Sequence, residues 1–308
     1  MSTAYLTHPS FLAHDTGAWH PESAARLRAI EQHLRATGLL DWMQVHEAPE
    51  VSPAALHAIH PPAHVQALRA RMPTHGSAQL DADTPVCPAS WSAALHAAGA
   101  VEHAVQRVLD GTATNAFCAV RPPGHHAEPA RAMGFCLLNN VAIGAAAALA
   151  RGLERVAVVD FDVHHGNGTE AAFAHRPDVL VCSAFQHPYY PYTDLGATAP
   201  NIVCAPLPPG TDGGAFQTAV ADHLLPALDR FAPQLILMSA GFDGHDADPL
   251  ADWHLTAQDY AWITERLCDL AARHAHRRIV STLEGGYDLG ALAASVAAHL
   301  EVLIGRGA

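Results

Sequence analysis

The sequence predicts an α/β protein with a central parallel sheet of about eight strands, flanked by helices on both faces. Two observations predict this class. Apolar segments of strand length alternate with longer helical segments over most of the chain, and such alternation implies crossover connections between parallel strands. Half of the 308 residues are apolar, which supplies a large core, and we expect residues 1–308 to form a single domain.

The first 90 or so residues look loop-rich and carry one amphipathic segment, residues 21–37, which begins with proline and ends at Gly38. From Trp91 onward the pattern is regular. Apolar periodicity predicts helices over residues 92–109, 139–151, 214–231, 256–275 and 289–304. Short apolar runs predict strands over residues 115–120, 155–161, 179–185, 234–241 and 278–283, with a proline-rich loop over 205–213.

Composition excludes two classes of partner. The chain has 30 acidic and 17 basic residues, a formal charge of −13, which repels nucleic acids and anionic membranes. The longest apolar stretch, residues 141–150, is too short to cross a bilayer, which needs about 20 residues. The six cysteines form no C-x-x-C pair, and no charged-then-apolar signal segment opens the chain, so we expect a cytoplasmic protein.

Unusual polar residues follow predicted strands at residues 125–126, 160–167, 243–246 and 284–287. Because the carboxyl ends of parallel strands lie along one edge of a sheet, we expect these four segments to converge on one site.

The second of these segments has the spacing of a metal site. Asp160, Asp162 and His164 alternate along an extended chain, so their side chains share one side of the backbone. Asp162 and His164, joined by Asp243, make a three-ligand set for Zn²⁺ that leaves a position open for water or substrate. Fe²⁺ suits the same ligands. A two-metal manganese site would want another carboxylate where the chain has His245, so one metal is favoured. The alternative is that these acids only cap the following helix.

The other segments supply groups for amide hydrolysis. His125 and His126 follow a Pro-Pro-Gly turn, and two adjacent imidazoles beside metal ligands predict a general base with a differently tuned partner. Tyr287 follows two glycines that let the backbone approach a ligand, and its phenol can stabilise the oxyanion that forms from an amide carbonyl. Exposed turn histidines and a tyrosine in a tight turn are the alternatives.

The segments RPPGHHAE, MGFCLLNN, DFDVHHGNGT, SAGFDGHDADPL and LEGGYDL together resemble the histone deacetylase and acetylpolyamine amidohydrolase superfamily, from about residue 15 to the end. Asn167 and residues 248–250 are similar to its class II and bacterial deacetylase-like branch. The resemblance implies the arginase/deacetylase fold and zinc-dependent hydrolysis of an N-acyl amide, chiefly N-acetyl, such as acyl-lysine or a related acylated amine.

The resemblance also implies roles for individual residues. Asp162, His164 and Asp243 would bind zinc, His126 would be the general base, and Tyr287 would polarise the scissile carbonyl.

Further residues would support them. His125 would be hydrogen-bonded to Asp160, and Asn167 would stand near His126. The resemblance also implies a structural K⁺, held by Asp160, Asp162, His164, Ser183 and Ala184.

The resemblance places the substrate between aromatic walls. Gly134 and Phe135 resemble residues that line the substrate tunnel, with Tyr189 or Tyr190 opposite. Leu250 stands where polyamine-selective relatives tend to carry an acidic residue, which weighs against strict polyamine use. Acetylpolyamine or small-amide hydrolysis stays open, as do an inactive acyl-lysine-binding module, an arginase-like ureohydrolase and a homo-oligomer.

Overall fold

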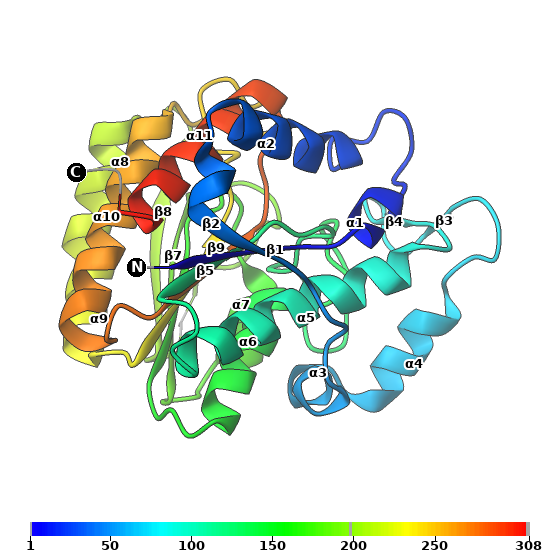
Figure 1. Ribbon diagram of the computed structural model, residues 1–308, viewed down its shortest axis with the longest axis horizontal. Helices are drawn as coiled ribbons and strands as arrows, with labels where there is room; N and C mark the ends of the chain where they lie inside the picture. The colour runs from blue at the N-terminus through cyan, green and yellow to red at the C-terminus, as the bar shows by residue number, and fades with distance from the viewer. Residues whose placement is uncertain (1, 197–198, 306–308) are drawn as a thin grey trace.

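Eight parallel strands form one sheet at the centre of the computed structural model, which describes residues 2–196 and 199–305 (Figure 1). The strand order is β2-β1-β5-β10-β9-β6-β7-β8. The strands are β1 (Thr3–Thr7), β2 (Met43–Glu47), β5 (Asn115–Cys118), β6 (Val156–Asp160), β7 (Val179–Gln186), β8 (Ile202–Leu207), β9 (Leu235–Ala240) and β10 (Ile279–Leu283). A separate antiparallel ribbon pairs β3 (Ala78–Gln79) with β4 (Pro85–Val86). The predicted class and the parallel sheet are confirmed.

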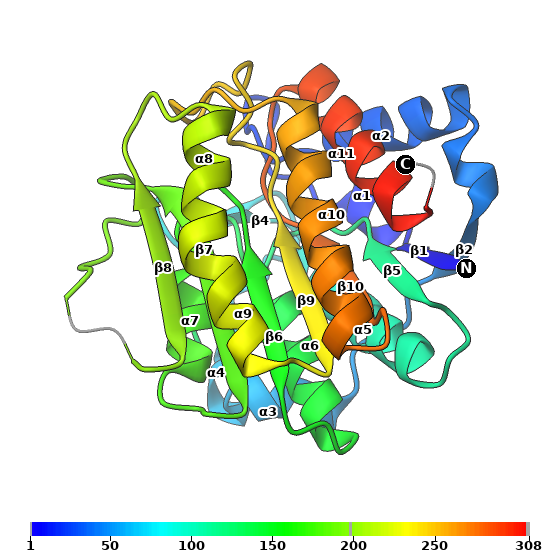
Figure 2. The same ribbon diagram turned by 90° about the vertical axis from the view of Figure 1, so that its left-hand side faces the viewer.

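Helices cover both faces of the sheet. In Figure 2 the helices α8, α10 and α11 lie in front of the strands, and α5, α6 and α7 lie behind them. The helices are α1 (Ser10–Ala13), α2 (Ala24–Ala36), α3 (Pro53–Ile59), α4 (Pro62–Ala70), α5 (Ser90–Leu109), α6 (Asn140–Ala150), α7 (Asn167–Phe173), α8 (Gly213–Ala219), α9 (Leu225–Phe231), α10 (Ala257–His274) and α11 (Leu289–Leu303), with a 3₁₀ turn η1 (Leu39–Trp42) and a π-helical turn η2 (Val220–Leu224).

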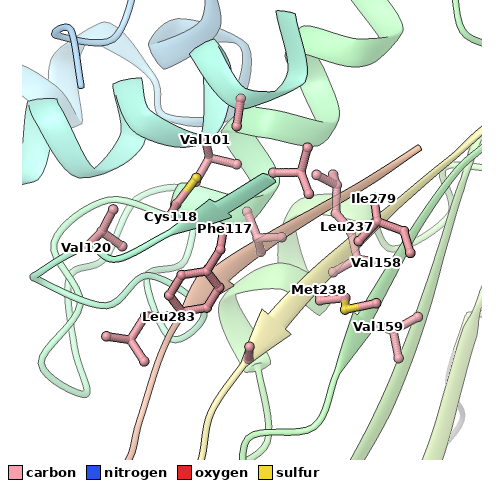
Figure 3. Close-up of a cluster of buried hydrophobic side chains, with 14 of the residues drawn as sticks. Val101, Phe117, Cys118, Val120, Val158, Val159, Leu237, Met238, Ile279 and Leu283 are labelled. Carbon is pink, nitrogen blue, oxygen red and sulfur yellow. The ribbon is translucent and has the colours of Figure 1, made fainter. Parts of the chain in front are cut away.

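The strands are buried on both sides, as a parallel sheet between two helical layers requires. Figure 3 shows Val158 and Leu237, partners in the β6–β9 ladder, on one side of the sheet, and Val159 and Met238 on the other. All four side chains are fully buried. Their alternation explains why β6 and β9 read as continuous apolar runs in the sequence.

Close helix packing on one face depends on a glycine. A Cβ atom on Gly144 of α6 would lie 2.5 Å from Cγ1 of Val101 in α5, and 3.7 Å from Leu237 beneath. Only glycine lets the two helices approach this closely over the sheet.

The prediction that the first 90 residues are loop-rich is wrong. They hold β1, β2 and the helices α1 to α4. The edge strand β2 escaped detection because only Met43 of its residues is buried, while Val45 is 52% exposed. The predicted loop 205–213 likewise overlaps β8, an edge strand that tolerates Pro206.

None of the helices in the described part of the chain combines the length and the apolar character that spanning a membrane requires.

Candidate metal-dependent active site

The four polar segments follow β5, β6, β9 and β10, which are neighbours in the sheet. Their carboxyl ends therefore deliver these segments to one place, at the edge of the sheet where the sequence predicted convergence.

Asp162, His164 and Asp243 form a buried cluster whose candidate ligand atoms all lie within 4.8 Å of one another. Nδ1 of His164 is 3.1 Å from Oδ1 of Asp162 and 3.1 Å from Oδ2 of Asp243. Burial lowers the pKa of His164, but hydrogen bonds to the two carboxylates outweigh burial and raise it to about 10. The cluster thus favours a positive charge where the three groups meet, and its two carboxylates and imidazole suit Zn²⁺.

The backbone holds both carboxylates in place. The N–H of Gly285 donates to Oδ2 of Asp162 at 2.8 Å, and the N–H of Val163 donates to Oδ1 of Asp243 at 3.0 Å. A Cβ on Gly285 would lie 1.9 Å from Oδ2 of Asp243, so a side chain there would displace this carboxylate. The glycine after β10 is therefore part of the site.

His126 is held in a defined tautomer. Its Nδ1 lies 2.8 Å from Oδ1 of Asn167, while the Nδ2 of Asn167 donates to Glu128 at 2.9 Å. Because the amide oxygen can only accept, the proton of neutral His126 is on Nδ1, and Nε2 is left with its lone pair. Burial and the neighbouring His125 lower the pKa of His126 well below its usual value, which keeps the ring neutral.

His125 has the opposite character. Its Nδ1 lies 2.9 Å from Oδ2 of Asp160. Burial lowers the pKa of His125, but Asp162 and Asp160 outweigh burial and raise it well above the usual value. Two rings whose centroids are 4.0 Å apart are thus tuned in opposite directions, a pattern typical of acid and base pairs.

Three of the five predicted K⁺ ligands lie side by side on neighbouring strands. Asp160 and Ser183 are paired residues of β6 and β7, and Ala184 follows. The buried Oγ of Ser183 has no hydrogen-bond partner among the described residues. A buried hydroxyl without a partner suits a cation that would accept its oxygen as a ligand.

All the predicted substrate residues line one cavity of about 200 Å³. His125, His126, His164 and Tyr287 line the same cavity, which therefore opens onto the metal cluster. The rest of its lining includes Asp83, Gly134, Phe135, Tyr189, Tyr190 and Leu250. The rings of Phe135 and Tyr287 meet edge to face at 5.9 Å, and the hydroxyl of Tyr189 donates to the carbonyl of Leu250 at 2.7 Å.

Sequence reasoning missed two buried acids that position these groups. Oε2 of Glu284 accepts the backbone N–H groups of Gly124 and His125, at 2.6 and 3.1 Å, and so holds the histidine turn. Oδ2 of Asp248 accepts the backbone N–H of Tyr287 at 2.6 Å. The signal for Glu284 was a carboxylate at the end of an apolar strand, directly before two glycines.

A third buried acid supports the same region. Glu22 binds Arg121 through two hydrogen bonds of 2.5 and 2.9 Å and lies 3.2 Å from Arg26. Arg26 in turn donates to the backbone carbonyls of Glu284 and Gly286. These three charged residues, which we call the Glu22 cluster, therefore connect α2 to the segment that carries Tyr287.

We expect the Glu22 cluster to make the free energy of unfolding depend on pH in the acid range. Burial raises the pKa of Glu22, but Arg121 and Arg26 outweigh burial and lower it from 4.5 to about 2. Because the pKa of Glu22 is lower in the folded state than in the unfolded state, ionised Glu22 stabilises the folded protein above pH 4.5. This stabilisation is lost as the pH falls toward 2. The full contribution of this pKa shift to the free energy of unfolding is about 3 kcal/mol. Urea unfolding of wild type and Glu22→Gln at several pH values checks it: their difference in unfolding free energy should shrink as the pH falls, and a constant difference would contradict the assignment.

Comparisons with known proteins identify one family. A model described as the histone deacetylase domain matches residues 20–303. A histone deacetylase-like amidohydrolase of Pseudomonas aeruginosa is 40% identical over 88% of this chain and 73% of its own. A probable deacetylase of Archaeoglobus fulgidus is 36% identical over 95% of this chain and 83% of its own. The crystal structure of the HDA15 HD domain superposes with a TM-score of 0.92 at 34% identity, covering 99% of this chain and 90% of that one.

Proposed function

This chain belongs to the histone deacetylase family, and from that premise we propose that it hydrolyses an N-acyl amide with Zn²⁺ held by Asp162, His164 and Asp243. Family membership supports hydrolysis of acetylated amides. The observation that carries the proposal is the buried ligand cluster beside a cavity that His126 and Tyr287 also line.

A Zn²⁺ ion held by Asp162, His164 and Asp243 would supply Lewis acidity, which polarises a carbonyl and makes water more acidic. The remaining work falls to side chains of this chain. His126 takes a proton from water at Nε2, because Asn167 engages its Nδ1–H and burial keeps the ring neutral. Tyr287 donates its hydroxyl proton in a hydrogen bond to the developing oxyanion. Either His126 or His125 then delivers a proton to the leaving amine.

The cavity supports a slender acylated amine as the substrate. Its walls are aromatic, from Phe135, Tyr189 and Tyr190, and they suit the apolar stem of an acyl-lysine. Leu250 brings no charge to the lining. One observation favours acetylpolyamines as a second candidate, because the carboxylate of Asp83 also lines the cavity and would attract a distal ammonium group.

Two supporting proposals accompany this function. A structural K⁺ at Asp160, Asp162, His164, Ser183 and Ala184 would give the unpartnered Ser183 hydroxyl a partner. The six free cysteines are compatible with a reducing compartment, and we place the protein in the cytoplasm.

The test is acetate release from an acetyl-lysine peptide and from an acetylated polyamine, with and without a chelator. We expect turnover of the peptide that the chelator abolishes and added Zn²⁺ restores. Turnover that survives metal removal would contradict the metal assignment. Peptide binding without any turnover would favour an inactive acyl-lysine-binding module, and urea release from a guanidino substrate would favour a ureohydrolase.

A further inference from the structure

A second group of side chains of the types that bind metals lies beside the candidate active site and has no part in the proposed reaction. His165 follows β6, Glu170 belongs to α7, and Cys204 belongs to the edge strand β8. One ligand atom from each lies within 4.8 Å of the other two. The β6–α7 connection, α7 itself and the more distant strand β8 thus bring a nitrogen, an oxygen and a sulfur donor close together.

The orientation of His165 suits a ligand. The ring is 3% exposed, and the ring of Phe185 packs against it at a centroid distance of 4.4 Å. Its Nδ1 lies 2.8 Å from Oγ1 of Thr193. When Nδ1–H donates to that hydroxyl, Nε2 presents its lone pair toward Glu170 and Cys204. Metal-binding histidines are commonly fixed in this way by a hydrogen bond from the other ring nitrogen.

The carboxylate of Glu170 lies at ion-pair distance from the ring of His165 without a hydrogen bond to it. Its Oε2 lies 3.0 Å from Nε2 of His165, yet this buried oxygen makes no hydrogen bond among the described residues. The two atoms are therefore close without the alignment of a shared proton. Two potential donor atoms this close together, with no proton shared between them, suit ligands of one cation.

Cys204 completes a set of nitrogen, oxygen and sulfur donors of the kind that binds Zn²⁺. Burial and the nearby carboxylate of Glu170 raise the pKa of its thiol to about 12, so the thiol stays protonated at neutral pH without a metal. Binding of a cation would release this proton to solvent and leave a thiolate ligand. His165 and Glu170 also line a surface cavity of about 330 Å³, which gives an ion a way in and leaves room for a water ligand.

We propose that His165, Glu170 and Cys204 bind a second transition-metal ion, of the Zn²⁺ class, in a site separate from the candidate catalytic one. Thiolate and imidazole donors select such an ion over Mg²⁺ or Ca²⁺. The ion would fasten the edge strand β8 to α7, whose first residue, Asn167, contacts the general base.

The test uses Co²⁺ added to the metal-free full-length chain. We expect two equivalents to bind per chain, and one of them to produce a thiolate-to-cobalt charge-transfer absorption in the near ultraviolet. Because Asp162, His164 and Asp243 contain no sulfur, this absorption cannot come from the candidate catalytic site, and the Cys204 variant below shows which of the six cysteines produces it. Added Zn²⁺ should displace the cobalt and remove the absorption.

Variants decide the assignment. Cys204→Ala should lose the absorption and one equivalent while it keeps the other, which also shows that the variant folds. Glu170→Gln, which keeps nearly the same side-chain shape, should lower the affinity for the second Co²⁺ ion at least about tenfold. The matched control is Cys268→Ala, which removes a half-buried thiol on α10 and should keep both equivalents. A cobalt-loaded wild type without the absorption, or a Cys204→Ala variant that retains it, would overturn the proposal.

Discussion

Asp243→Asn is expected to abolish metal binding at the candidate catalytic site and hydrolysis with it. Asparagine keeps the shape of the side chain and an oxygen for the N–H of Val163, which now donates to Oδ1 at 3.0 Å. It removes one of the two negative charges beside His164, and an amide is a far weaker ligand for Zn²⁺ than a carboxylate. Metal analysis of the desalted protein, together with acetate release, measures both losses.

The matched control for this variant is Asp246→Asn, three residues further along the same loop. The side chain of Asp246 is 64% exposed and contacts His254 at the surface. This variant should retain metal and activity. Full activity in Asp243→Asn would remove Asp243 from the ligand set and, with it, the central premise of the proposed site.

His126→Ala is expected to lower kcat by about 10²- to 10⁴-fold, the usual contribution of a general base. The loss follows because His126 is the one neutral imidazole among the described residues that line the cavity. Asn167 engages its Nδ1 and leaves its Nε2 free to accept a proton. Metal content should stay unchanged, since His126 is not a member of the ligand cluster. Steady-state kinetics with metal analysis on the same sample separates the two effects.

His75→Ala serves as the control, because His75 is an exposed histidine remote from the lining of the cavity. An unchanged kcat in His126→Ala would assign the base to another residue. A loss of metal in His126→Ala would instead show that His126 acts through the ligand cluster.

The predictions that succeeded rested on local patterns. The runs that became β6 and β9 are apolar because both of their faces are buried, and their short length distinguishes them from helices. The family predicted from the motifs is confirmed by the family model and the relatives, and the arginase/deacetylase fold by the structural match. The roles of individual site residues stay predictions, although the side chains meet as expected.

The predictions that failed concern elements and contacts with little local signal. The strands β1 and β2 are short, and β2 is mostly exposed, so pairing with distant strands decides their conformation. Asp248 and Glu284 hold segments of the candidate site through backbone N–H groups 39 and 160 residues away. Such contacts leave no periodicity in the sequence.

The sequence by itself determined the class of the protein, its family and the positions of the candidate metal ligands, because the alternation of apolar runs and the spacing of Asp162 and His164 are properties of neighbouring residues. Tertiary structure alone decided which atoms meet: that Asn167 selects the tautomer of His126, that two arginines surround Glu22, and that Cys204 from an edge strand reaches His165 and Glu170. These contacts join segments that are remote along the chain, and only the packing of the sheet and its helices brings them together.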